Sequence, residues 1–92
     1  MKINITSRKF TISEDLAQLV RDKLSKISKY DNQINSIDVI LLKESRAEKV
    51  EIIATSKNHS YIIKCYSSAF EKTILMAFNN LKIQIAKTKN KH

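Results

Sequence analysis

The sequence predicts an α+β fold, a two-layer sandwich in which two helices pack on one face of a four-stranded sheet. Four segments alternate apolar and polar residues with period two, as half-buried strands do. Two other segments carry apolar residues at helical spacing behind a capping residue. The predicted order is therefore β-α-β-β-β-α. Because 92 residues are enough for one domain and too few for two, residues 1–92 are predicted to form a single domain.

The first strand and the first helix are predicted in the first third of the chain. Residues 2–8 alternate as a strand with Ile3 and Ile5 facing the core. A capping box over residues 11–14 predicts a helix start, and Ser13 is an equally good N-cap. The following apolar residues form one stripe that continues to Tyr30. We therefore expect a helix to about residue 30, with that stripe against the sheet.

Three more strands are predicted around residues 37–41, 50–55 and 61–66, and their short links favour an antiparallel meander. The sequence has no Gly and no Pro. Turns are expected at Asp31-Asn32 and at Asn58, because Asn and Asp tolerate left-handed backbone best. The open face of the sheet is expected to carry Ile40, Leu42, Ile53, Ile62 and Tyr66.

The second helix is predicted from a capping box formed by Ser68 and Glu71 to about Lys89. Its apolar residues again recur at helical spacing. Two helices with one apolar stripe each must bury those stripes on the same sheet face, which completes the sandwich.

Composition and motifs indicate a protein that is not an enzyme. A chain without glycine cannot form the Gly-rich loops that bind phosphates or dinucleotides. His59 is expected in a solvated loop and Cys65 in the core, and together they are too few to ligate zinc. We therefore expect no catalytic residue, metal, cofactor or small-molecule substrate.

The location expected from the sequence is the cytoplasm. A single cysteine excludes an internal disulfide and favours a reducing compartment. The N-terminal residues alternate, whereas a signal peptide would show an apolar run. No stretch approaches 18 apolar residues, so no membrane partner is expected.

The positive charge is concentrated at the two ends of the chain. The net charge is +8. Residues 1–30 carry seven basic and three acidic groups, residues 31–66 five of each, and residues 67–92 five basic and one acidic. Such a field attracts polyanions. Codon bias toward Lys, Ile and Asn is the competing explanation, although bias alone would not leave the middle neutral.

Basic side chains bordering the two helices are the candidate binding residues. Lysines on adjacent helices can line a shared groove that binds phosphate backbones, which require charge but little geometric precision. Lys23 lies close to the apolar stripe, so we expect its stem to pack while its ammonium group reaches outward. A merely solvated basic surface is the alternative. The candidate RNA-binding residues are Arg8, Lys9, Lys23, Lys26, Lys29, Lys82, Lys87, Lys89 and Lys91.

Several segments resemble the ribosome hibernation promoting factor family, also called ribosome-associated translation inhibitors or sigma-54 modulation proteins. They are residues 4–7, 12–16, 23–27 with 29–30, and the closing pattern from Leu81 to Lys91. The resemblance implies a short-form member: one ribosome-binding domain with a basic tail from about Lys87. It further implies binding to the small (30S) ribosomal subunit, in the channel for tRNA and messenger RNA. Contacts to rRNA phosphates there would inhibit translation in idle or stressed cells.

The chain departs from that family pattern in its second helix. Where the family has an Asp-x-Tyr-x-x-Ile-Asp segment, this chain has Ala69 and Leu75 at the two acidic positions and Glu71 at the tyrosine. Two positions that are basic in the family are Asn80 and Ile83 here.

Two alternative functions remain open. One is a general double-stranded-RNA-binding protein, whose usual fold shares the β-β-β-α portion and reads backbone shape. The other is a protein–protein module that uses the open sheet face, with weak self-association there as one form.

Overall fold

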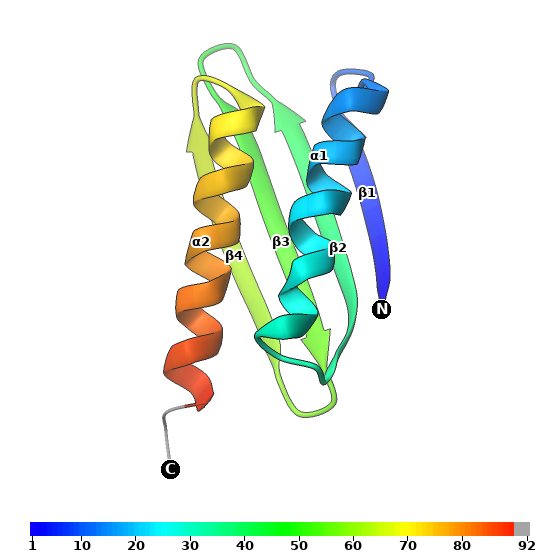
Figure 1. The fold of residues 1–92 in the computed structure, drawn as a ribbon. Coiled ribbons are helices and arrows are strands. Elements are labelled where there is room, and N and C mark those ends of the chain that lie inside the picture. Colours follow the sequence, from blue (N-terminus) through cyan, green and yellow to red (C-terminus); the bar gives the residue numbers. More distant parts are fainter. Residues whose placement is uncertain (90–92) are drawn as a thin grey trace.

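The protein, described here for residues 1–89 of a computed structural model, has one layer of strands and one layer of helices (Figure 1). The order of elements agrees with the sequence prediction, with one short 3-10 helix added. The elements are β1 (Lys2–Arg8), α1 (Glu14–Leu24), η1 (Ser25–Lys29), β2 (Ile34–Lys43), β3 (Glu48–Ser56), β4 (Ser60–Ser67) and α2 (Phe70–Lys89).

The four strands form a single sheet in the order β1-β2-β3-β4. β1 pairs parallel with β2, whereas β2–β3 and β3–β4 are antiparallel, as predicted for the meander. A parallel pair needs a crossover connection, and α1 supplies it. The register sets Ile5 beside Val39, Val39 beside Ile52 and Ile52 beside Ile63, so one row of aliphatic side chains crosses the whole inner face.

Both helices cover the same face of the sheet and run side by side (Figure 1). Their buried residues include Val20, Leu24 and Ile27 from the first helical segment and Ile74 and Leu81 from α2. Each fully buried aliphatic side chain contributes about 1.5–3 kcal/mol relative to an exposed one. The predicted α+β two-layer sandwich is therefore confirmed, and no helix among residues 1–89 is apolar and long enough to cross a membrane.

α1 and η1 form one continuous helical segment, which has Ser13 as its N-cap and changes from α-helix to 3-10 helix before it ends. The Ser13 hydroxyl accepts a hydrogen bond from the backbone N–H of Leu16 at 3.1 Å, so Ser13 is the N-cap. The predicted continuous helix to Tyr30 is wrong in detail, because residues 25–29 form the 3-10 helix η1. The hydroxyls of Ser25 and Ser28 donate to carbonyls three residues earlier, at 3.1 and 3.3 Å. Such bonds compete with the α-helical pattern.

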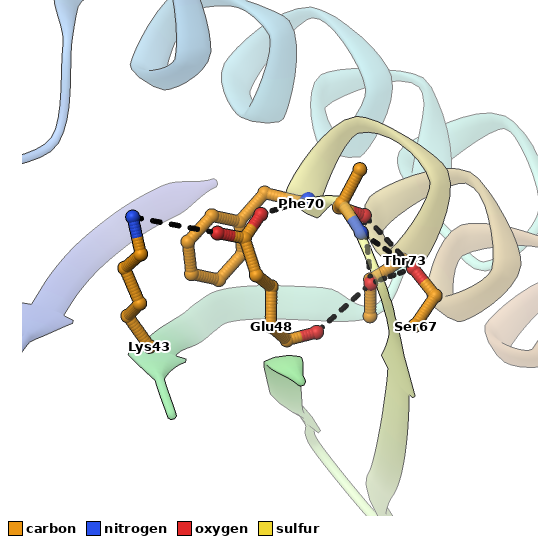
Figure 2. A network of polar contacts seen from close by, with 6 residues as sticks. Lys43, Glu48, Ser67, Phe70 and Thr73 are labelled. Atoms are coloured by element: carbon orange, nitrogen blue, oxygen red, sulfur yellow. Dashed lines mark hydrogen bonds and ion pairs between the residues drawn. The ribbon is translucent and has the colours of Figure 1, made fainter. Parts of the chain in front are cut away.

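The N-terminus of α2 is capped from a neighbouring strand, contrary to the capping box predicted for Ser68 and Glu71. The backbone N–H of Phe70 donates to the Glu48 carboxylate of β3 at 2.8 Å, and Lys43 lies 3.9 Å from that carboxylate (Figure 2). Ser67 accepts from the backbone N–H of Ala69 at 3.2 Å. Ala69 holds the N-cap position, since its carbonyl accepts from the N–H of Thr73 at 3.0 Å. Alanine cannot cap, so Glu48 supplies the missing acceptor and a favourable negative charge.

Turns form where they were predicted, but the left-handed residue is a different one. Asp31 Oδ1 accepts from the N–H of Gln33 at 3.0 Å, which closes the turn before β2. The β3–β4 turn around Asn58 is closed by the N–H of Ser56 donating to the carbonyl of His59 at 2.8 Å. Among residues 1–89, Lys9 alone has a positive φ, 68°. A non-glycine residue in this conformation costs on the order of 1 kcal/mol.

Candidate nucleic-acid interface

Most of the predicted basic residues lie near the two opposite ends of the sheet, and Arg8 points to its open face instead of the helical layer. Both helices begin at one end of the sheet and finish at the other (Figure 1). Arg8 ends β1 and Lys9 forms the turn toward α1, so this pair lies at the end where the helices begin. Lys26 and Lys29 lie in η1, at the opposite end. The sequence prediction did not separate these two groups.

The last turn of α2 brings two more lysines to the end where η1 lies. Lys87 and Lys89 are exposed in that turn. Cations are favourable near a helix C-terminus, where the carbonyl ends of the peptide dipoles gather. The predicted extent of α2 to Lys89 is confirmed, while Lys91 lies outside the described residues.

Lys82 connects the two helical segments. Its Nζ atom lies 5.0 Å from the ring centroid of Phe78 and 5.6 Å from that of Tyr30, which follows η1. Cation–π contacts of this kind contribute about 0.5–1 kcal/mol at exposed sites. Tyr30 was predicted to belong to the buried stripe, but its side chain is 42% exposed and contacts Lys82 instead. Lys23 is half-buried, as its position beside the stripe predicted.

The two terminal lysines of α2 border different hollows. Lys89 lines a hollow with Asp31 and His59, on the side of the turn before β2. Lys87 lines another with Ile63 and Lys64, on the side of β4. The basic residues of α2 thus scatter around its axis, as the sequence indicated, and Lys87 does not belong to a groove shared with the first helix.

Ion pairing distinguishes the helical layer from the rest of the chain. Among residues 1–89 the ion pairs join Lys43 to Glu48 at 3.9 Å, Lys49 to Glu44 at 2.5 Å and Lys64 to Glu51 at 3.6 Å. All three lie between β2 and β4, within the segment that the sequence showed to be neutral.

Lys49 also holds the pKa of the Glu44 carboxyl below its usual value, by a hydrogen bond and by its charge. None of the candidate residues of the helical layer takes part in an ion pair within residues 1–89. Their charge is therefore available to an external polyanion.

Two carboxylates near the helical layer accept hydrogen bonds from neutral partners. Asp22 accepts from the Gln18 amide at 2.7 Å. The buried Asp31 accepts from the Tyr61 hydroxyl at 3.0 Å. Burial and the neighbouring Asp31 raise the pKa of Tyr61. Neither carboxylate forms an ion pair with a lysine among residues 1–89.

The five apolar residues predicted for the open face of the sheet lie there, among charged ones. Ile62 and Tyr66 are 57% and 69% exposed, and Ile40, Leu42 and Ile53 are half-buried. A hollow of 390 Å³ lies at the end of this face that carries Arg8 and Tyr66. Two of the lysines that line it, Lys49 and Lys64, are the ones paired with carboxylates.

Cys65 and His59, the residues considered for catalysis or metal binding, lie where the sequence predicted. Cys65 is buried and accepts from the Asn80 amide at 3.3 Å, so it is the core residue that was predicted. His59 lies exposed in the β3–β4 loop, also as predicted. Within residues 1–89 no group of three metal-ligating side chains comes together.

Two departures from the family pattern place apolar side chains in solvent. Leu75 and Ile83, both on α2, are 43% and 52% exposed. This surface was not predicted, because only the stripe that faces the core was considered. The signal was present, since Leu75, Met76 and Ile83 lie outside that stripe.

Comparison with known proteins agrees with this architecture. The ribosome hibernation promoting factor of Salmonella typhimurium is 28% identical over 92 residues, which cover 100% of this chain and 93% of that protein. A ribosomal subunit interface protein from Coxiella burnetii superposes with a TM-score of 0.93 at 24% identity, covering 99% of this chain and 100% of that one.

The N-terminal domain of Thermus thermophilus Protein Y superposes with a TM-score of 0.87 at 18% identity, covering 96% and 99%. Both structural likenesses establish the fold. The family described as sigma 54 modulation protein / S30EA ribosomal protein matches residues 3–92, nearly the whole chain. This chain therefore belongs to the sigma 54 modulation protein / S30EA ribosomal protein family, whose members are ribosome-associated hibernation factors and not enzymes.

Proposed function

We propose that this protein is a ribosome hibernation factor that binds the small ribosomal subunit through rRNA phosphates. Binding in the channel for tRNA and messenger RNA would inhibit translation in idle or stressed cells. Family membership supports a ribosomal partner in the cytoplasm, and the relative from Salmonella typhimurium carries the hibernation name.

The observation that carries the proposal is the unpaired charge of the helical layer. A cation that already has a carboxylate partner must break that pair to contact a phosphate, whereas Lys26, Lys29 and Lys87 need not. Each phosphate neutralised by a lysine releases condensed counterions, which makes binding favourable and strongly salt-dependent. Nine residues are proposed as rRNA contacts: Arg8, Lys9, Lys23, Lys26, Lys29, Lys82, Lys87, Lys89 and Lys91.

The opposite ends of the helical layer suggest two separate phosphate contacts. Arg8 and Lys9 would meet one segment of rRNA, while the lysines of η1 and of the last turn of α2 would meet another. Because Arg8 lies on the open face of the sheet and Lys87 beside β4, these contacts would reach more than one side of the protein, which suits a folded RNA surface better than a single small anion.

Co-sedimentation with purified 30S subunits over a salt series tests the proposal. We expect the protein to pellet with the subunit, to lose affinity steeply as salt rises, and to resist competition by free duplex RNA. Displacement by duplex RNA at similar concentration would identify a general double-stranded-RNA-binding protein. Failure to pellet at low salt would contradict the ribosomal proposal altogether.

A further inference from the structure

α2 carries apolar side chains on two opposite sides. Its inner side packs on the sheet through buried residues such as Ile74, Leu81 and Ile85. Leu75, Met76 and Ile83 are nevertheless 43%, 38% and 52% exposed. A helix at the surface of a domain is normally polar on the side away from the core, so this second apolar side is unexplained by folding.

The exposed residues are spaced like the seam of a coiled coil. Met76, Asn79, Ile83 and Ala86 are separated by three, four and three residues, the spacing by which one helix packs along another. They span about 15 Å of helix. We call these four residues, together with Leu75, the outer face of α2. Next to it lies a hollow lined by Tyr30, Asn79, Lys82, Ile83 and Ala86.

The border of the outer face is positively charged. Lys72, Lys82 and Lys87 surround it on α2, and Glu71 is the acidic residue on this helix. These lysines take no part in the ion pairs found among residues 1–89. An apolar centre with a charged rim is the usual composition of a protein interface. The open face of the sheet differs, because Lys49 and Lys64 there are already paired with carboxylates.

From these observations we infer that the outer face of α2 docks an acidic amphipathic helix of another protein. Apolar residues of that helix would cover Leu75, Met76 and Ile83, and its carboxylates would meet the lysines at the border. A second copy of this chain would instead bring like charges together. A nucleic acid would leave the apolar centre without a complementary contact, because its outer surface is phosphate.

This inference goes beyond ribosome binding and does not depend on it. Lys82 and Lys87 at the border are also proposed rRNA contacts, whereas Leu75, Met76 and Ile83 are not. The docking test therefore depends on the apolar residues, and its failure leaves the ribosomal proposal intact.

Binding of a synthetic helix to the full chain tests the inference. The probe is a fluorescently labelled peptide of about three heptads with Leu at the seam positions and Glu on the flanks. We expect the peptide to bind, and Ile83→Lys to weaken binding about tenfold, as loss of a central apolar contact does. Tyr66→Lys is the matched control: it adds the same charge at a side chain 69% exposed on the open sheet face, and affinity should not change.

Several outcomes would overturn the inference. No binding of the acidic peptide, or equal binding by a peptide with Ser in place of each Leu, would do so. Equal weakening by Tyr66→Lys would mean that net charge alone governs binding. Concentration-dependent dimerisation of the chain that Ile83→Lys abolishes would make a second copy the occupant. Circular dichroism and thermal unfolding of each variant establish that the exposed substitutions leave the fold intact.

Discussion

Lysines of the helical layer and lysines of the open sheet face differ in whether they are paired with carboxylates. On the sheet side, Lys49 and Lys64 lie 2.5 and 3.6 Å from carboxylates. In the helical layer the candidate lysines form no ion pair among residues 1–89, and Lys82 is held by aromatic rings. The difference teaches that net charge is a poor guide to a binding surface. The arrangement of carboxylates decides which cations remain available to a partner.

Charge reversal on each face gives the largest expected effect. Lys23→Glu with Lys26→Glu should weaken 30S binding by roughly a hundredfold at moderate salt, because two phosphate contacts become repulsions. Lys49→Glu with Lys64→Glu makes the same change in net charge on the sheet side and should change affinity only slightly. Co-sedimentation measures both, and circular dichroism checks the fold. Equal losses would show that overall charge, and not the helical layer, drives binding.

Removal of the Tyr61 hydroxyl should reduce stability more than any change of a surface ion pair. Tyr61→Phe leaves the buried Asp31 carboxylate without its 3.0 Å donor. An unsatisfied buried acceptor costs about 1–3 kcal/mol. Urea unfolding at neutral pH measures the loss in the free energy of unfolding. A variant as stable as the wild type would mean that water replaces the hydroxyl.

The same hydroxyl predicts a loss of stability in alkali. Burial and Asp31 raise the pKa of Tyr61 above its usual value of 10.0. A raised folded-state pKa means that the contribution is complete below the unfolded-state pKa and disappears as pH rises through the folded-state value. The stability difference between the wild type and Tyr61→Phe should therefore shrink as pH rises beyond 10.0. A constant difference over that range contradicts this assignment.

Two carboxylates of β3 allow the stability of a helix cap to be compared with that of a surface ion pair. Glu48 accepts from the N–H of Phe70 at 2.8 Å, whereas Glu51 is paired with Lys64. Glu48→Ala should lower the free energy of unfolding by about 1 kcal/mol, the value of a helix cap. Glu51→Ala should lower it by less than about 0.5 kcal/mol, because exposed pairs contribute little. Chemical unfolding of both variants decides whether the cap or the pairing matters.

The smallest effect is expected at Glu44. Lys49 lowers the pKa of the Glu44 carboxyl from its usual 4.5. Its contribution is therefore present above that value and is lost as pH falls through the folded-state pKa, but solvent screens this exposed pair. NMR titration should show Glu44 protonating at lower pH than usual, and Lys49→Gln should return it to the usual range. An unshifted Glu44 in the wild type would mean that the pair does not persist in solution.

The predicted strands and helices were confirmed where the hydrophobic period of a segment also determines which of its faces is buried. The alternation of β2 through β4 and the stripe of α2 specified their faces, because a strand or helix can bury only one set of positions. The predictions were wrong at the end of the first helix and at the start of α2. Ser68 has the right spacing for a cap, yet Glu48, 22 residues before Phe70, accepts the hydrogen bond. A local pattern cannot reveal a partner that arrives from another strand.

The residues of the candidate site stay a prediction, and the structure adds their arrangement. The lysines were identified from their position beside the helical stripes, and Lys23 is half-buried as expected. Lys87 and Lys89 border different hollows, and Arg8 and Lys9 lie at the far end from η1. Helix rotation and the direction of the crossover determine these placements, and neither can be calculated from the charge pattern.

The sequence by itself determined the order of elements, the core faces, the lack of glycine-dependent chemistry and the excess of charge at both ends of the chain. These follow from local periodicity and composition, which act within a few residues. The tertiary structure alone decided which lysines are paired and how Glu48 caps α2. Those features depend on contacts between segments far apart in the chain, because only folding brings the charges of one strand to the end of another element.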